Sequence, residues 1–369
     1  MLRKYTALPE QCLSILGPRR VPPLKCPAQN THSSLAISTS VGFASLQVRD
    51  YDSATNILYP DATLTAVDLV QEDKISVKRT EKSADRTHAW LRDTLAGIED
   101  DNPEAARPAV FASIPPIEKE QQSFFLSDLS NDYSSKLSGI CLYSPTSIDV
   151  IPNNLQGLPR MCLMNPASPH DILKAIMYGV DLVSTPFVSK TSEHGIAFDF
   201  TFPIIPRGAP QPLGRDMWSS NYATSITPLS PSCECYTCTQ HHRAYVHHLL
   251  QAREMLAWTL LQIHNFAALD RFFAAVRESI INGTFNHDKD CFNRAYEPEM
   301  PKQTGGGPRV RGYQTKSVGG GEPKKNPKAY GRLEDQLERT AEAKTDVAEP
   351  MAEMTTQETT QSNFAEKAQ

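Results

Sequence analysis

The chain of 369 residues lacks several features that define common protein classes. No apolar run approaches the ~18 residues that a helix needs to span a bilayer. The formal net charge is only -5, so any contact with RNA must come from a local patch. The sequence also contains no Walker loop, no dinucleotide fingerprint after a strand and no recognisable serine or cysteine triad. These absences argue against an integral membrane segment, a globally basic nucleic-acid binder and the common nucleotide-binding classes.

The cysteines also lack the spacing of a disulfide framework. Five of the eight are scattered along the chain, which favours a reducing compartment. The N-terminus carries Arg3 and Lys4, but Pro9 and Glu10 interrupt the amphipathic helix that a mitochondrial leader would need. We therefore expect a cytoplasmic protein. The five scattered cysteines are Cys12, Cys26, Cys141, Cys162 and Cys291.

The other three cysteines form a dense motif with a distant histidine. Cys233, Cys235, Cys238 and His264 have the spacing C-x-C-x2-C-x25-H. Three thiols and one imidazole complete a tetrahedral zinc site and leave no position for a reactive water. The spacing thus predicts one structural zinc ion, with His264 at the far end of an amphipathic helix that folds back toward the cysteines. The alternative is a set of free or disulfide-paired cysteines beside an unrelated histidine.

The residues around this motif indicate a family. Arg243-Ala244-Tyr245 follows the last cysteine, and Leu260-Leu261-x2-His264-Asn265-Phe266 surrounds the histidine. Together with the cysteines, this pattern closely resembles the zinc subdomain of the tRNA-guanine transglycosylases. Members of that family exchange a guanine in a tRNA anticodon for queuine or its precursor. The resemblance implies that the same four residues hold zinc, and that helices of this subdomain build a dimer interface.

A second segment bears on catalysis. Gly179-Val180-Asp181-Leu182-Val183-Ser184 resembles the family's active-site strand G-V-D-M-F-D, whose last aspartate is the nucleophile. Ser184 stands at that position, and a hydroxyl without a base cannot replace a carboxylate that forms a glycosyl intermediate. The sequence also has neither the S-D-S-G-G-F-Q stretch nor the G-G-L-A-x-G-E loop that hold the base in catalytic members. The resemblance therefore implies that this chain has no catalytic residues.

Other segments resemble the non-catalytic accessory subunit of the heterodimeric queuine tRNA-ribosyltransferase. Residues 76–87 match its K-R-x-x-K-S-x-D-R block, and His194-Gly195-Ile196-Ala197-Phe198 matches a second region in outline. The resemblance implies a catalytic queuine tRNA-ribosyltransferase subunit as partner and contact with tRNA through the complex. It implies a cytoplasmic location, with a peripheral position at the mitochondrial outer membrane as an alternative. Two other functions stay open: an active transglycosylase with a displaced nucleophile, and a zinc-stabilised nucleic-acid-binding or scaffold protein with a decayed barrel.

Alternating apolar runs and helical stretches predict a βα architecture. Runs buried on both faces fit a (β/α)8 TIM-type barrel, which is also the fold that the resemblance implies. Only six such runs are visible, so we expect either a truncated N-terminus or a variant without the first βα units. Helices are expected over 83–98 and 168–178, the second with an N-cap at Ser168, proline at N1 and a C-cap at Gly179. The six predicted strands cover 34–38, 62–69, 109–113, 139–143, 161–164 and 180–184.

The C-terminal part is expected to differ in character. Apolar residues at three- and four-residue spacing predict one helix that includes 249–263 and another over 269–280. Residues 301–332 carry eight basic residues against one acid, and residues 333–369 carry three basic against nine acidic residues. The first stretch is either a loose RNA-binding arm or a solvated linker. We expect a barrel portion over 1–225, a zinc-binding helical subdomain over 226–295 and a disordered tail over 296–369.

Overall fold

The computed structural model describes residues 2–39, 42–70, 76–100 and 108–308, and the predicted RNA-binding arm therefore lies largely outside the described residues. Its centre is a parallel sheet of six strands in the order β1-β4-β5-β6-β7-β8. The strands are short and separated by helices, as parallel strands with crossover connections must be. They are β1 (Ile15–Leu16), β4 (Ala62–Leu64), β5 (Ala109–Ser113), β6 (Gly139–Leu142), β7 (Arg160–Cys162) and β8 (Leu182–Val183).

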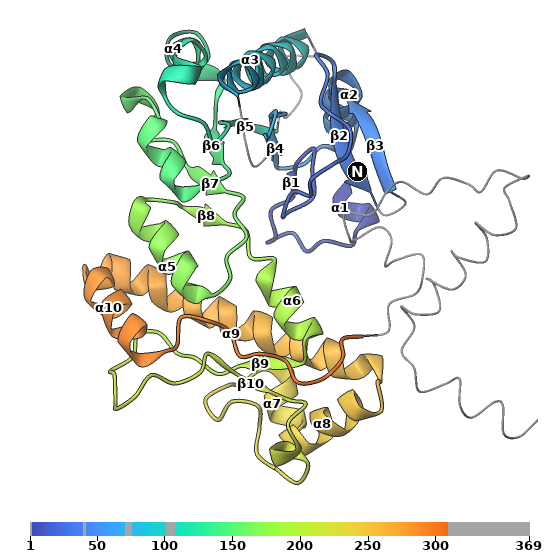
Figure 1. Cartoon of the computed structure of the whole chain (residues 1–369), viewed down its shortest axis with the longest axis vertical. Helices are drawn as coiled ribbons and strands as arrows, with labels where there is room; N and C mark the ends of the chain where they lie inside the picture. The colour runs from blue at the N-terminus through green and yellow to red at the C-terminus, as the bar shows by residue number, and fades with distance from the viewer. Residues whose placement is uncertain (1, 40–41, 71–75, 101–107, 309–369) are drawn as a thin grey trace, which may run out of the picture. The chain divides into compact units, whose positions relative to one another are not determined.

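The order of the strands leaves the sheet open. β1 pairs with β4 and β8 pairs with β7, and within the described residues neither end strand has a second partner. The sheet curls but does not close (Figure 1). The predicted closed (β/α)8 barrel is therefore not present in the described part of the chain, because six strands are too few to complete a ring of eight.

Five of the six predicted strands lie in this sheet, and one prediction was wrong. Residues 34–38 form β2 (Ser34–Thr39), which pairs antiparallel with β3 (Gly42–Gln47) in a separate two-stranded sheet. A short apolar run does not reveal whether its partner strand is parallel or antiparallel, so the periodicity of the sequence could not have indicated the pairing of β2. β1 was not predicted, since it has only two residues and Ile15 is 42% exposed.

A close approach between strands explains one glycine. Gly139 pairs with Phe111 across β6 and β5. A Cβ atom at Gly139 would lie 2.3 Å from the ring of Phe111. Glycine therefore lets the phenylalanine ring lie directly over the neighbouring strand.

The helix at 168–178 was predicted closely, and α5 (Pro169–Tyr178) has Ser168 as N-cap and Gly179 as C-cap with φ 100°. The Ser168 hydroxyl makes no capping hydrogen bond, and the Asp171 carboxylate instead accepts from the backbone N–H of Ala167 at 2.8 Å. The helix expected from residue 83 begins earlier, as α3 (Val77–Asp100). The remaining helices of this part are α1 (Leu2–Tyr5), α2 (Val48–Leu58), α4 (Ser123–Asn131) and α6 (Phe187–Glu193), with 3-10 turns at 120–122, 134–136, 145–150 and 153–155.

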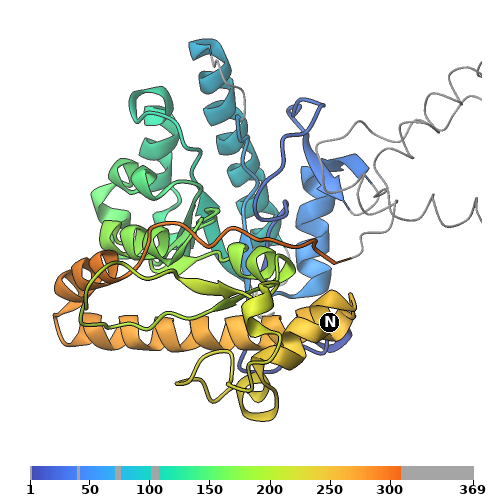
Figure 2. The same ribbon diagram turned by 60° about the horizontal axis from the view of Figure 1, so that its bottom comes forward.

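Helices dominate the C-terminal part of the described chain. The long helix α9 (Met255–Ile281) lies beside α6 and the hairpin of β9 (Ile196–Phe198) and β10 (Gly214–Asp216), as Figure 2 shows from below. Within the described residues, no helix has both the length and the apolar character that crossing a bilayer demands. The other elements are α7 (Tyr236–Gln240), α8 (Arg243–Gln251), α10 (Phe285–Ala295) and a 3-10 turn at 220–222.

The single helix predicted across 249–263 was wrong. The chain leaves α8 after residue 251 and starts α9 at residue 255, with Arg253 between them at φ 54°. His264 consequently lies inside α9 and not at the end of a helix. The three- and four-residue spacing of apolar residues continues across the turn between α8 and α9, so the spacing did not indicate the turn. Two residues of the predicted apolar stripe, Leu256 and Ile263, are 44% and 38% exposed. In the second predicted stripe Ile280 is likewise exposed, whereas Leu269, Phe272 and Val276 are buried.

The described beginning of the expected tail contacts the body of the protein. Tyr296 is buried, and Thr304 donates through both its N–H and its hydroxyl to the Asp216 carboxylate, at 2.9 and 2.6 Å. Gly305 lies against the Trp218 ring so closely that a Cβ atom would stand 2.1 Å from it. Thr304 and Gly305 thus contact β10 and the residue two positions after it.

Candidate metal centre

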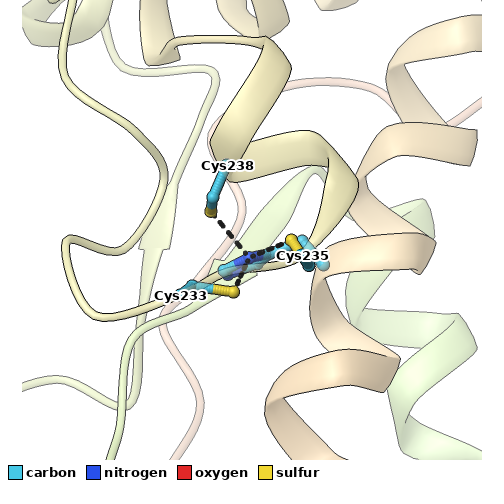
Figure 3. A group of neighbouring side chains, drawn as sticks. Cys233, Cys235 and Cys238 are labelled. Carbon is cyan, nitrogen blue, oxygen red and sulfur yellow. Dashed lines mark hydrogen bonds between the residues drawn. The ribbon is translucent and has the colours of Figure 1, made fainter.

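The four predicted ligands come together from two parts of the chain. Cys233 and Cys235 precede α7, Cys238 lies within it, and His264 extends from α9. The segment before α7 contains a turn, in which the Cys233 N–H donates to the Ser230 carbonyl at 3.2 Å. These elements bring the three sulfur atoms around one edge of the imidazole ring (Figure 3).

A buried contact holds α7 against α9. The hydroxyl of Thr237 donates to the Leu260 carbonyl at 2.7 Å, one helical turn before the histidine. Thr237 is fully buried, and its neighbour Cys238 is nearly so. This bond fixes the distance between the cysteine loop and the helix that carries His264.

The distances fit tetrahedral coordination. The Nδ1 atom of His264 lies 3.5, 3.6 and 3.3 Å from the sulfur atoms of Cys233, Cys235 and Cys238. All four ligand atoms lie within 4.8 Å of one another. Zinc bonds of about 2.3 Å to sulfur and 2.05 Å to nitrogen would give S···N separations of ~3.6 Å at tetrahedral angles. The S···N separations therefore fit a tetrahedral metal ion held by these four groups.

The backbone sets the orientation and tautomer of the histidine. His264 is 0% exposed, and its Nε2 lies 2.8 Å from the Phe198 carbonyl, so this nitrogen carries the proton and donates. Nδ1 is the atom that faces the three sulfur atoms, and in the neutral ring it would offer its lone pair to a metal. A ligand histidine usually has such a partner on its other nitrogen.

Asn265, next to the histidine, fastens α9 to the neighbouring strand. Its side-chain oxygen accepts from the Phe198 N–H at 2.8 Å, and its amide donates to the Ile196 carbonyl and the Ser192 hydroxyl, each at 2.9 Å. The sequence placed Asn265 within a family motif but gave it no role. The sequence feature that could have indicated this role is a polar amide in the middle of an otherwise apolar helix.

The electrostatics of the site favour a bound cation. Burial raises the pKa of the Cys233 thiol, but hydrogen bonds with His264 and Arg271 outweigh that effect and the pKa falls. For Cys235, burial also acts upward, and contacts with His264 and the Cys238 N–H lower the pKa overall. Low thiol pKa values favour the thiolate, which is the form that binds metal. Four ligand groups close the coordination sphere, so a metal here would have a structural role.

A second polar cluster lies at the carboxyl end of the sheet, around Asp68, which is 0% exposed. Arg79 donates to both carboxylate oxygens at 2.8 and 2.9 Å, and Arg86 donates at 2.9 Å. Burial raises the pKa of Asp68, but hydrogen bonds from Arg79, Asn30 and Arg86 outweigh it, and the pKa lies below its usual value. The carboxylate is thus satisfied by side chains of this chain.

The block at 76–87, which pointed to the accessory subunit, supplies most of this cluster. Besides the two arginines, Ser83 donates to the Asp68 carbonyl, and the Thr87 hydroxyl accepts from the Asp68 N–H at 3.1 Å. The four residues share one side of α3 because Ser83, Arg86 and Thr87 follow Arg79 by four, seven and eight positions, which is one or two helical turns. Part of the motif therefore holds the chain after β4 in place.

Ser184, at the position of the family nucleophile, directly follows β8. Its hydroxyl donates to the Met164 carbonyl at 2.6 Å. The described hydrogen bonds of Ser184 include no histidine or carboxylate that could act as a base. Asp181, directly before the same strand, accepts from the N–H and Nε of Arg160 at 2.8 and 3.1 Å. The strand end thus carries a hydroxyl bonded to backbone and an ion pair.

The described part of the chain is an α/β protein in which an open parallel sheet is followed by a helical Cys3His centre. A comparison with protein families matches residues 1–298 to the model described as queuine tRNA-ribosyltransferase. This match covers more than half of the sequence. The chain belongs to the queuine tRNA-ribosyltransferase family, that is, the tRNA-guanine transglycosylases.

Individual relatives agree with this assignment. A protein of Schizosaccharomyces pombe named queuine tRNA-ribosyltransferase accessory subunit 2 is 31% identical over 342 residues, 92% of this chain and 76% of its own length. A protein of Xenopus tropicalis with the same name is 28% identical, over 77% of this chain and 78% of its own. A queuine tRNA-ribosyltransferase of Dehalococcoides mccartyi is 29% identical over 58% of this chain and 53% of its own. The chain thus spans about three quarters of the first two relatives and half of the third.

Proposed function

We propose that this chain is the non-catalytic accessory subunit of a heterodimeric queuine tRNA-ribosyltransferase, which exchanges guanine for queuine at the anticodon wobble position of tRNA. The observation that carries the proposal is the environment of Ser184. A nucleophile needs either a carboxylate or a hydroxyl activated by a base, and the Ser184 hydroxyl donates to the Met164 carbonyl. The names of the relatives from fission yeast and frog support the accessory role.

We propose zinc as the metal of the Cys3His centre. Three thiolates and a neutral imidazole are the ligands that structural zinc sites use, and the 3.3–3.6 Å contacts match its bond lengths. The ion would join the loop before α7 to α9 and so fix the helices of this subdomain. It would supply folding energy and no chemistry.

The partner surface is proposed to lie on α7 and α8. His241 stacks on Tyr245 with ring centroids 5.0 Å apart and meets Tyr236 edge-on at 5.6 Å. Tyr236 is 59% exposed. Clustered tyrosines at a partly exposed site are typical of protein interfaces, because they combine large contact area with hydrogen-bonding groups. The proposed metal site would lie close to this surface, since Tyr236 directly follows Cys235 and precedes Cys238 by two residues.

The proposed organisation is a barrel portion over 1–225, the zinc subdomain over 226–295 and a tail over 296–369. The open sheet would be six strands of a TIM-type (β/α)8 barrel. tRNA would be bound through the complex, and the location would be the cytoplasm or the cytoplasmic face of the mitochondrial outer membrane. The unclosed sheet favours one alternative function, a zinc-stabilised nucleic-acid-binding or scaffold protein.

The decisive experiment measures incorporation of labelled guanine into tRNA by this chain alone, by a catalytic homologue alone and by the mixture. We expect exchange only in the mixture, or strongly increased exchange there. Ser184→Asp assayed alone should stay inactive, because one carboxylate does not rebuild the base-binding loops. Activity of the isolated chain would contradict the proposal. If the mixture shows no exchange and the two chains form no complex, the result would favour the scaffold alternative.

A further inference from the structure

Arg271 lies beside the proposed metal centre without being one of its ligands. It follows His264 by seven residues on α9, close to two turns, so both side chains leave the same face of the helix. Its Nη1 donates to the Cys233 sulfur at 2.9 Å. The sequence motif did not include this residue.

The charge of the ligand set gives this contact its meaning. Three thiolates, a neutral imidazole and a divalent zinc ion add up to one net negative charge. A guanidinium is protonated at every accessible pH, so Arg271 brings the centre to neutrality. Hydrogen bonds in which one partner is ionised are stronger than neutral ones, and a thiolate that accepts such a bond is a weaker base.

We propose that Arg271 is a positioning residue that neutralises the Cys3His centre, holds the Cys233 thiolate in place and slows loss of the metal. The inference rests on the proposed zinc site. Metal leaves such a site when a thiolate is protonated or detached, and Cys233 is the ligand farthest along the chain from His264. A charged hydrogen bond to that sulfur opposes both events. Removing groups that contact metal ligands from outside typically costs 10–100-fold in metal affinity.

The geometry argues against a purely packing role. Arg271 as a whole is exposed, whereas Cys233 is buried. An exposed side chain contributes little buried apolar area, so its removal should leave the folded core intact. Its effect is therefore expected on the metal and not on the helix.

The test uses the full-length, zinc-loaded chain and its variants Arg271→Gln and Arg271→Lys, with Arg277→Gln as matched control. Arg277 is exposed on the same helix and lines a cleft beside α5. Bound zinc is quantified first by mass spectrometry of the metal. The rate of transfer to a chromophoric chelator is then measured for each protein. We expect release about 10-fold or more faster for Arg271→Gln. Arg271→Lys should fall between, and Arg277→Gln should match the parent.

A second readout separates charge from structure. In the cobalt-substituted protein, the thiolate-to-cobalt absorption should move to longer wavelength in Arg271→Gln, because a sulfur that loses its hydrogen bond gives up an electron more easily. Equal release rates and unchanged spectra for Arg271→Gln and Arg277→Gln would overturn the inference alone. A parent protein that binds no zinc would overturn the metal assignment as well. Should Arg271→Gln fail to fold, the rate of zinc release from Arg271→Lys is the test: a rate above that of the parent supports the inference, and a rate equal to it contradicts the inference.

Discussion

Two buried polar clusters of this protein differ in how their charges are balanced. Around Asp68, the carboxylate receives hydrogen bonds from Arg79, Arg86 and Asn30. Around His264, the sulfur atoms of three cysteines and one ring nitrogen lie within 4.8 Å of one another, which is the donor set of a metal site. In the first cluster, side chains of the protein itself supply the opposite charge, whereas the second gathers groups that bind a metal cation.

This difference separates a structural cluster from a ligand site. Buried charges must be paired, because an unpaired one costs several kcal/mol. Where the chain itself supplies the opposite charge, as at Asp68, no ligand is needed. Where several metal-binding groups converge, as at His264, a bound cation would pair them. The same test explains why the carboxyl end of the sheet, which holds catalytic sites in many barrels, need not be a catalytic site here.

The largest effect is expected from loss of a metal ligand. Cys235→Ala should release the metal and unfold α7 to α9, since apparent binding energies of structural zinc are on the order of 10 kcal/mol. It should also abolish assembly with the partner. Metal content, helix content by circular dichroism and protease resistance of the C-terminal part would measure this.

Cys12→Ala is the control for that experiment, because Cys12 is an exposed cysteine in the N-terminal part. It should keep the metal and the helices. A Cys235→Ala protein that retained both helicity and partner after losing its metal would show that the centre is dispensable.

The next largest effect is expected at the complete cluster. Asp68→Ala leaves Arg79 and Arg86 without their carboxylate, and breaking a buried pair in this way costs about 3–5 kcal/mol. Urea denaturation would measure the change in the free energy of unfolding. Asp93→Ala removes an exposed pair with Arg92 and should stay within about 0.5 kcal/mol. Equal stability of the two variants would refute the structural role of Asp68.

A smaller loss is expected at Asn265. Asn265→Ala would leave the Phe198 N–H and the Ile196 carbonyl without this partner, at a cost of about 2–3 kcal/mol. Because these bonds hold β9, which also orients His264, zinc release should accelerate as well. Thr259→Ala, at an exposed position of the same helix, is the control for both measurements. An unchanged rate of zinc release from Asn265→Ala would show that the contact of Asn265 with β9 does not influence the metal centre.

The smallest effect is a dependence on pH. Because the folded-state pKa of Asp68 lies below its unfolded value of about 3.9, its contribution is fully present above that value. It is lost as the pH falls through the folded pKa. The stability difference between the parent and Asp68→Asn should therefore be constant from pH 7 to about pH 5 and shrink below about pH 4. A difference that did not change on acidification would contradict the lowered pKa.

The two clusters were unequally predictable from sequence. The four residues that the structure brings together were found because C-x-C-x2-C spacing carries its chemistry within six residues, and only His264 had to be found at a distance. Asp68 was missed because its partners lie 38 residues before it and 11 and 18 residues after it, which no local pattern connects. Arg271 was missed for a similar reason, since surface arginines on helices are common.

The fold divides in the same way. Apolar runs located six strands, five of them in the parallel sheet, and the caps of α5 were read from Ser168 and Gly179. Periodicity could not show that β2 pairs with β3, nor that Arg253 breaks the helix between Leu249 and Ile263. In both cases the apolar spacing is compatible with two structures, and tertiary contacts select one.

We expect this chain to act through a surface organised by a metal and not through a catalytic pocket. The most direct test removes the metal stepwise with a chelator while sedimentation follows the complex with the catalytic subunit. We expect the complex to dissociate in proportion to metal loss and to re-form when zinc is restored. A complex that persists with the metal-free chain would contradict the proposed role of the metal.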